Sequence, residues 1–239
     1  MLVGMGFTTR RLAKRLEARG APFHGVGRDF HAGLVPKEAV AVLSIPPLEG
    51  LEGERLHEFI REIAPRRVVY ISATSVYGEE ENVDETTVPR PAGEKSVARF
   101  EEEQWLLSNR WSNLIVRPAA IYGPGRGVHE KIREGKLPRS AGSGVVSRIH
   151  VDDLVAVLDA AIGSDLEGAW PLADEHPCPS EEVAEFCVRS FGWEPVRSVI
   201  NTAQHGRRVD GRKIRELLGV RLKYPSYETG IPASVAEPH

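Results

Sequence analysis

The stretch MLVGMGFTTRRLAKRLEARGAPFHGVGR, residues 1–28, decides the fold class of this 239-residue chain. Residues 1–3 predict a strand that is cut short at its beginning, and residues 8–19 predict a helix with one apolar face. Residues 4–9 between them predict a glycine-bearing turn, and residues 22–26 predict a second strand. A strand, a glycine turn, a helix and another strand are typical of a parallel α/β sheet.

The glycines of this turn have the spacing of a dinucleotide-binding loop. In such a loop the first Gly permits a tight turn, and the second lets the backbone approach the diphosphate. The helix that follows offers free N–H groups and the positive end of its dipole. We therefore expect Gly4, Gly6, Phe7 and Thr8 to bind a dinucleotide. The third position of the pattern is Thr9, so a glycine turn before an ordinary helix is the alternative.

The end of the second predicted strand indicates which dinucleotide is bound. An NAD-binding protein usually carries an Asp or Glu about 20 residues after the loop, where it binds the ribose 2′-hydroxyl. This chain has Gly27 and Arg28 there. Without the carboxylate a 2′-phosphate is not repelled, and a guanidinium binds phosphate through two parallel hydrogen bonds. We expect NADP(H) to be preferred over NAD(H), unless Arg28 is only a surface arginine in a loop.

Strand and helix signals alternate along the rest of the chain, which predicts a mostly parallel sheet with helices on its faces. The further predicted strands are residues 39–45, 67–72 and 113–117. The further predicted helices are residues 52–63, 97–108, 152–162, 181–191 and 211–218. Loops that carry Pro and Tyr fill the rest of the tail.

The composition restricts the partner and the compartment. Thirty-one Lys and Arg against 34 Asp and Glu give a net charge of −3. Because these charges are dispersed, we expect neither a nucleic-acid partner nor a charged membrane partner. The longest apolar stretch, residues 40–45, is too short to span a membrane, and no secretion signal opens the sequence. We therefore expect a cytoplasmic protein.

The two cysteines provide no disulfide framework. Cys178 and Cys187 are the only cysteines in the sequence, and so low a number fits a reducing compartment. His176 lies close to Cys178, but no second pair of ligands completes a metal site in the sequence. We therefore expect no bound metal.

Three later segments carry a family resemblance. They read VVYISATSVYG at residues 68–78, VRPAAIYGPGR at residues 116–126 and RIHVDDL at residues 148–154. With these segments the chain resembles the extended short-chain dehydrogenase/reductase superfamily, in its NAD-dependent epimerase/dehydratase branch. The resemblance implies a Rossmann-like doubly wound parallel sheet, a nicotinamide dinucleotide and a small C-terminal cap. On this basis residues 1–122 and 148–164 would form the dinucleotide-binding core, and residues 123–147 and 165–239 the cap.

The resemblance also implies where the ligands lie. The nicotinamide end of the cofactor would contact Ser72 and Pro118, because ligands of open parallel sheets lie beyond the carboxyl ends of the strands. The residues that it assigns to the substrate cleft are Ser75, Tyr77, Tyr122, Arg126 and His150. His150 precedes a predicted helix, where a structural role is the alternative. The loop 123–147 would cover the cleft, unless it is only a surface connection.

The catalytic set of the family is substituted in this chain. The catalytic Ser or Thr of the family corresponds to Ala73, and its Tyr-x-x-x-Lys pair corresponds to Lys95 and Arg99. No tyrosine lies between Tyr77 and Tyr122, so no shift of the alignment restores the pair. Without a positioned acid, the reduction of a carbonyl has no proton donor. Thr74 and Lys95 are the candidate replacements.

The region that would bind adenine is also reduced. Residues 28–40 leave room for a short loop, whereas the family usually has a further helix and strand there. Two hypotheses follow for the whole chain. It is either an NADP(H)-dependent epimerase- or reductase-type enzyme that acts on a carbonyl or sugar-like small molecule, or a non-catalytic NADP(H)-binding sensor or scaffold. Family members often dimerise through the two helices predicted at 52–63 and 97–108, which implies a homodimer.

Overall fold

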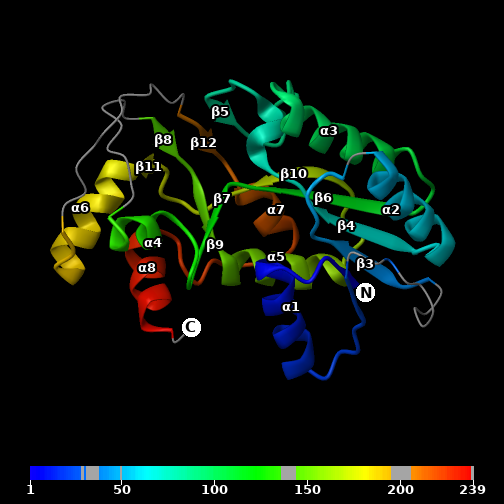
Figure 1. Cartoon of the computed structure of the whole chain (residues 1–239), viewed down its shortest axis with the longest axis horizontal. Coiled ribbons are helices and arrows are strands. Elements are labelled where there is room, and N and C mark those ends of the chain that lie inside the picture. Colours follow the sequence, from blue (N-terminus) through cyan, green and yellow to red (C-terminus); the bar gives the residue numbers. More distant parts are fainter. Residues whose placement is uncertain (28–29, 31–37, 49, 136–143, 195–205, 238–239) are drawn as a thin grey trace.

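The computed structural model describes residues 1–27, 30, 38–48, 50–135, 144–194 and 206–237. Its centre is a sheet of six parallel strands in the order β10-β6-β4-β3-β1-β2 (Figure 1). These strands are β1 (Leu2–Val3), β2 (Gly25–Val26), β3 (Val40–Leu43), β4 (Arg67–Ile71), β6 (Ser112–Pro118) and β10 (Gly168–Leu172). The predicted Rossmann-like parallel sheet is confirmed.

Helices cover both faces of this sheet, because the strands are apolar on both sides. On one face α1 (Phe7–Ala18) and α5 (Val151–Ile162) pack against each other and share a core with alternate residues of β4 and β6. On the other face α2 (Gly50–Ile63) and α3 (Glu94–Leu107) cover a second core. The register of β4 and β6 aligns their carboxyl ends, so that Ile71 lies opposite Val116.

The sheet ends at β2 in the part of the chain that the structure describes. Residues 27, 30, 38 and 39, the described residues between β2 and β3, form neither helix nor strand. The rest of this region, where the family's usual helix and strand are predicted to be missing, lies outside the described residues. The classical strand order of the fold continues beyond the second strand, whereas the described part of this sheet ends at β2, on the side where adenine would lie.

The remaining elements form the cap and the connections to it. Three small strand pairs join β5 (Asn82–Val83) to β12 (Arg208–Val209), β7 (Ala120–Tyr122) to β9 (Arg148–His150), and β8 (Val145–Val146) to β11 (Cys178–Pro179). The helices are the short η1 (Thr74–Tyr77), α4 (Val128–Arg133), α6 (Ser180–Phe191), α7 (Arg212–Leu217) and α8 (Tyr227–Ala236). Helices α4, α6 and α8 gather at one end of the molecule and α2 and α3 at the other (Figure 1).

Two parts of the tail differ from the sequence interpretation. Residues 168–172, within the range predicted for the cap, form the edge strand β10 of the central sheet, and α7 packs against this strand. Residues 227–236, predicted as loop, form α8 with Pro232 inside it. Among the described residues, no helix has both the length and the apolar character needed to cross a membrane.

Candidate functional site

The chain turns at Gly4, directly after β1. Its φ of +85° is strained for any residue with a side chain. A Cβ at this position would lie 2.5 Å from Cγ2 of Ile45 and 2.6 Å from the carbonyl oxygen of Ser44. The Gly4 N–H donates to the Val26 carbonyl at 2.9 Å, which ties the turn to β2. Glycine is therefore required here by the packing of the sheet itself.

Gly6, in contrast, faces open space. A Cβ at Gly6 would have no atom within 4 Å, and the residue is exposed. Gly6 is the N-cap of α1 and has no side chain that could bond the amides of the first turn. Thr9 stabilises the loop through two hydrogen bonds. Its hydroxyl accepts from the Gly6 N–H at 2.9 Å and donates to the Gly4 carbonyl. The free space and the free helix N-terminus fit the diphosphate of a dinucleotide.

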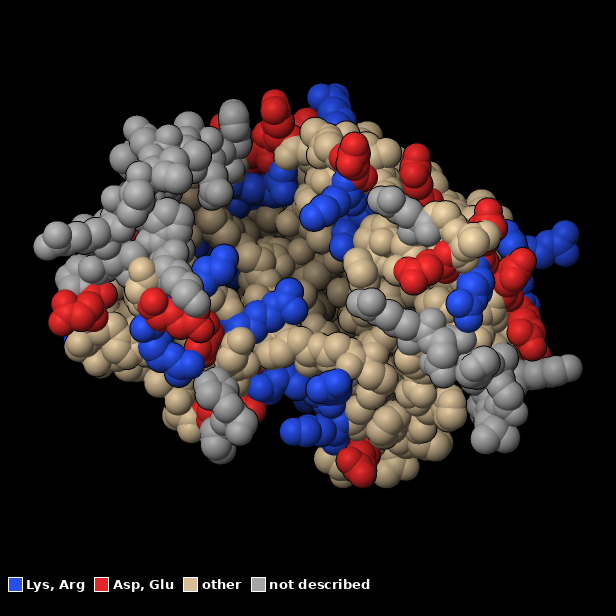
Figure 2. Space-filling view, viewed as in Figure 1, with Lys and Arg blue, Asp and Glu red and all other residues tan. Residues whose placement is uncertain are grey.

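Two arginines lie close to this helix N-terminus. The guanidinium carbons of Arg126 and Arg11 lie 5.3 Å and 5.5 Å from the centre of the Phe7 ring, within the range of cation–π contacts. The first turn of α1 contains no acidic residue. Figure 2 shows that the molecule is hollowed near its centre and that Lys and Arg side chains line the rim of this hollow. An anionic ligand is favoured electrostatically at this place.

A buried polar network lies under the carboxyl ends of β4 and β6. Arg117 forms a two-point ion pair with Glu103, in which Nη2 and Oε2 are 2.6 Å apart, and both side chains are almost completely buried. The Ser72 hydroxyl donates to Glu103, and Arg117 Nη1 donates to the Tyr77 phenol oxygen at 3.1 Å. Burial raises the pKa of Tyr77, although Arg117 acts in the opposite direction. The network holds the carboxyl ends of β4 and β6 together, but its side chains are buried and offer no exposed acid.

The loop after β4 is anchored by the cap. Arg207 donates to the carbonyl oxygens of Thr74 at 2.6 Å, Glu80 at 3.0 Å and Gly78. Thr74 is half-buried at the start of η1 and Ser75 is exposed. Pro118, at the end of β6, is buried and pairs with Leu172 of β10. The residues of β4, η1 and β6 that were predicted to contact the cofactor and the substrate therefore lie at the carboxyl ends of the central strands. Ligands of open parallel sheets bind at these ends.

The residues that replace the catalytic pair do not form an acid–base pair. Lys95, in the first turn of α3, is exposed. Arg99 Nη1 is 3.5 Å from the Tyr70 phenol oxygen, so that its side chain reaches toward β4. Burial raises the pKa of Tyr70, with Arg99 opposing. The catalytic roles predicted for Thr74 and Lys95 stay predictions.

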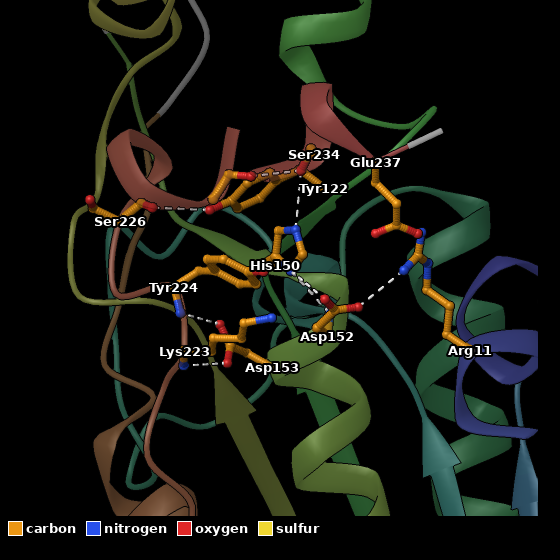
Figure 3. Close-up of polar contacts among 11 residues, drawn as sticks. Arg11, Tyr122, His150, Asp152, Asp153, Lys223, Tyr224, Ser226, Ser234 and Glu237 are labelled. Carbon is orange, nitrogen blue, oxygen red and sulfur yellow. Dashed lines mark hydrogen bonds and ion pairs between the residues drawn. The ribbon is translucent and has the colours of Figure 1, made fainter. Parts of the chain in front are cut away.

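Tyr122 and His150 lie in the joint between the core and α8 (Figure 3). The Tyr122 phenol donates to the Ser226 carbonyl at 3.2 Å. His150 caps α5, since its Nδ1 accepts from the Asp152 N–H at 3.2 Å, and its Nε2 lies 3.1 Å from Oγ of Ser234. Burial lowers the pKa of His150 to about 4. Both ring nitrogens of His150 are thus in hydrogen-bond contact with other parts of the protein. The substrate-cleft roles predicted for Tyr122 and His150 stay predictions.

Arg11 links α1 to α5 and to the residue that follows α8. Its guanidinium lies 3.1 Å from Asp152 of α5 and 2.9 Å from Glu237, directly after α8 (Figure 3). The side chain that stacks on Phe7 therefore also contacts the cap. Sequence reasoning did not identify Arg11 or Arg207, because their partners lie far away along the chain. Of the two residues predicted to favour NADP(H), Gly27 is exposed after β2, and Arg28 lies outside the described residues.

The chain is similar to known proteins over much of its length. Residues 51–169 match the model of the NAD dependent epimerase/dehydratase family. A 3-diazoavenalumate denitrifying reductase from a Streptomyces species is 27% identical over 164 residues, which cover 60% of this chain and 54% of the relative. The chain thus spans only about half the length of this curated relative.

Two solved structures match nearly the whole chain. A conserved protein of unknown function from Silicibacter pomeroyi is 30% identical, with a TM-score of 0.83 and coverage of 98% of this chain and 97% of that chain. A candidate NAD-dependent epimerase/dehydratase from Methylobacillus flagellatus is 25% identical, with a TM-score of 0.81 and coverage of 98% and 96%. Together with the Gly4–Gly6 loop and the parallel sheet, these findings show that the chain belongs to the NAD-dependent epimerase/dehydratase family.

Proposed function

We propose that the chain binds NADP(H) over the Gly4–Gly6 loop and transfers hydride between this cofactor and a small molecule. It would do so without the Tyr-Lys pair that serves as the proton donor in the family. The observation that carries the proposal is the open N-terminus of α1. Gly6 leaves space above the first turn, and the guanidinium groups of Arg11 and Arg126 lie close to the Phe7 ring in that turn. Arg11 is also paired with two carboxylates, so Arg126 is the stronger source of positive charge there. A bound nicotinamide dinucleotide would supply the hydride, and the chain would supply binding, orientation and exclusion of water.

The preference for NADP(H) rests on the end of β2. Gly27 stands where NAD-binding relatives of this fold usually carry a carboxylate, and Arg28 follows it. A single charge-assisted contact with a 2′-phosphate is worth about 1.5–3 kcal/mol, or roughly ten- to a hundredfold in affinity. The connection between β2 and β3 is short, so it offers few residues that could bind the adenine half of the cofactor. Contact with the 2′-phosphate would then be a main contribution to cofactor binding at this side of the sheet.

The substrate that the site suits best is one whose reduction creates no alkoxide. A carbonyl that accepts hydride needs a proton, and the Tyr-Lys pair that would support its delivery is absent. The Streptomyces relative is by name a denitrifying reductase of a diazo compound. When hydride adds to an aryl diazonium group, the products are an arene and N₂, and no oxygen has to be protonated. Thr74, half-buried beside Ala73, would orient such a substrate or donate a hydrogen bond to a carbonyl.

The test begins with calorimetric titration of the chain with NADPH and NADH. We expect NADPH to bind at least tenfold more tightly. NADPH oxidation is then followed with carbonyl compounds, nucleotide sugars and an aryl diazonium salt. Turnover with the diazonium salt alone supports the proposed class, and equal affinity for both dinucleotides contradicts the cofactor preference.

A non-catalytic NADP(H)-binding protein is the second candidate. Ala73 and the exposed Lys95 favour it, because neither can replace the acid–base set of the family. The distinguishing variant combines Ala73→Ser, Lys95→Tyr and Arg99→Lys. Carbonyl reduction that appears only in this triple variant would support loss of catalysis in the native chain, whereas native turnover would exclude a purely binding role.

The homodimer implied by the family resemblance remains part of the proposal. Helices α2 and α3 lie together on one face of the sheet, where His57 stacks on Trp105 with ring centres 3.6 Å apart and bonds to Glu102 at 3.0 Å. Leu51 and Leu107 on these helices are exposed apolar side chains. Sedimentation equilibrium tests this assignment, and a monomer at all concentrations would contradict it.

A further inference from the structure

The segment between β10 and α6 brings together three side chains that bind metals in other proteins. His176 lies in the loop after β10, Cys178 lies in β11, and Glu182 lies in the first turn of α6. The ligand atoms of these three residues all lie within 4.8 Å of one another. None of the three belongs to the Gly4–Gly6 loop or to the buried network of Ser72, Glu103 and Arg117.

The spacing is close to that of a zinc site. Ligands around tetrahedral Zn²⁺ lie about 3.3–3.6 Å apart, given bond lengths of about 2.1 Å to N or O and about 2.3 Å to S. His176 Nε2 and Glu182 Oε1 are already 3.2 Å apart. The three ligand atoms lie within 4.8 Å of one another, so the thiol has to approach by at most about 1.2–1.5 Å to complete the set. Imidazole, thiolate and carboxylate are the three ligand types that Zn²⁺ takes from proteins.

Contacts outside the three ligands hold them in place. The Tyr227 phenol donates to Glu182 Oε1 at 2.8 Å, and the His176 backbone N–H donates to Asp174 at 3.2 Å. Arg148 Nη1 donates to Cys178 Sγ at 3.3 Å and to the Cys178 carbonyl at 2.9 Å. Hydrogen bonds of this kind orient metal ligands. The Arg148 charge favours the thiolate and opposes the approach of a dication, so its two effects on affinity partly cancel.

One side of the cluster is open to solvent. The side chains of His176 and Glu182 are 47% and 44% exposed, whereas Cys178 is buried. An ion can therefore enter from solvent, and a water molecule can occupy the remaining position. Three protein ligands with one open position are the arrangement of catalytic rather than closed structural zinc sites.

We propose that His176, Cys178 and Glu182 bind one Zn²⁺ ion with a fourth position left to water. Binding replaces the proton of the Cys178 thiol, which is released to solvent. The expectation of no metal rested on the lack of a second pair of ligands in the sequence. Glu182 follows Cys178 by four residues, and the first turn of α6 brings its carboxylate to the other two ligands. This site is independent of the proposed NADP(H) function.

Cobalt titration of the metal-free, full-length chain tests the proposal. We expect a thiolate-to-Co²⁺ charge-transfer band in the near ultraviolet that saturates at one equivalent and disappears when Zn²⁺ is added. Cys178→Ser should abolish this band, whereas Cys187→Ser, which removes the other buried thiol, should leave it unchanged. Because Cys178 is buried, two exposed ligands provide a second test. His176→Gln and Glu182→Gln should each weaken Co²⁺ binding by about tenfold or more.

A further variant, Tyr227→Phe, tests the contacts outside the three ligands. It removes only the hydrogen bond to Glu182, and it should weaken Co²⁺ binding by roughly ten- to a hundredfold. The proposal is overturned if the native chain gives no charge-transfer band, or if the band persists in Cys178→Ser. A Co²⁺ affinity of Glu182→Gln within twofold of native would also overturn it.

Discussion

Replacement of Glu103 by Gln tests the buried network under the cleft. Glu103 has no exposed surface, and its two oxygens accept from Arg117 and from the Ser72 hydroxyl. Gln keeps the size but removes the charge, so that Arg117 is left buried without its counter-ion. Breaking a buried ion pair by removing one partner costs about 3–5 kcal/mol. Since small domains have about 5–15 kcal/mol of unfolding free energy, this loss is a large fraction of the total.

Urea unfolding followed by circular dichroism at pH 7 measures this loss. The control is Glu80→Gln, which breaks an exposed pair with Arg90 whose partners are 37% and 76% exposed, and which should cost about 1 kcal/mol or less. The double variant Glu103→Gln, Arg117→Met removes both charges and should be less destabilised than Glu103→Gln alone. A change below about 1 kcal/mol for Glu103→Gln would refute the reasoning.

The remaining predictions concern the cofactor, the acid and the pH dependence. Arg28→Ala should weaken NADPH binding by roughly tenfold or more and leave NADH binding unchanged, as measured by calorimetry; a parallel loss for both would contradict a 2′-phosphate contact. Lys95→Met should leave any NADPH oxidation unchanged within twofold, because Lys95 is exposed at the start of α3; complete loss of steady-state turnover would show that Lys95 is the acid. His150 has a folded-state pKa of about 4, below the ordinary value of 6.5, so its contribution to stability is present above pH 6.5 and is lost as the pH falls toward 4. His150→Gln should therefore reduce the acid-induced decrease in melting temperature between pH 6.5 and pH 4.5, and an unchanged decrease would exclude this role.

The central sheet could be predicted from the sequence because its signals are local. Apolar runs of strand length, separated by helices with one apolar face, specify buried parallel strands without knowledge of the partners. Strand β10 has a weaker signal, since Pro171 cannot donate to a neighbouring strand. Pro171 is tolerated because β10 is the edge strand beside β6. Helix α8 buries Tyr227 and Ile231, but it contains Pro232 and has little contrast between its faces, so its helical period is weak in the sequence.

The site was predictable only in part, for the same reason. Gly4 and Gly6 have a spacing that carries a mechanism of its own. Thr9 stands where the pattern has its third glycine. Its hydroxyl forms hydrogen bonds with the backbone of both Gly4 and Gly6. Contacts such as Arg207 with the Thr74 carbonyl and Arg11 with Glu237 join residues that are more than a hundred positions apart. No local pattern indicates such pairs.

Binding of NADPH to Gly6→Val tests the central claim most directly. The Val side chain enters free space, so the variant should keep the native circular dichroism spectrum, with an N-cap cost of only about 1 kcal/mol. The same side chain would occupy the position of the diphosphate. We predict that calorimetry detects NADPH binding to the native chain and no NADPH binding to folded Gly6→Val. Equal binding by both proteins would show that the loop is an ordinary turn and would contradict the account.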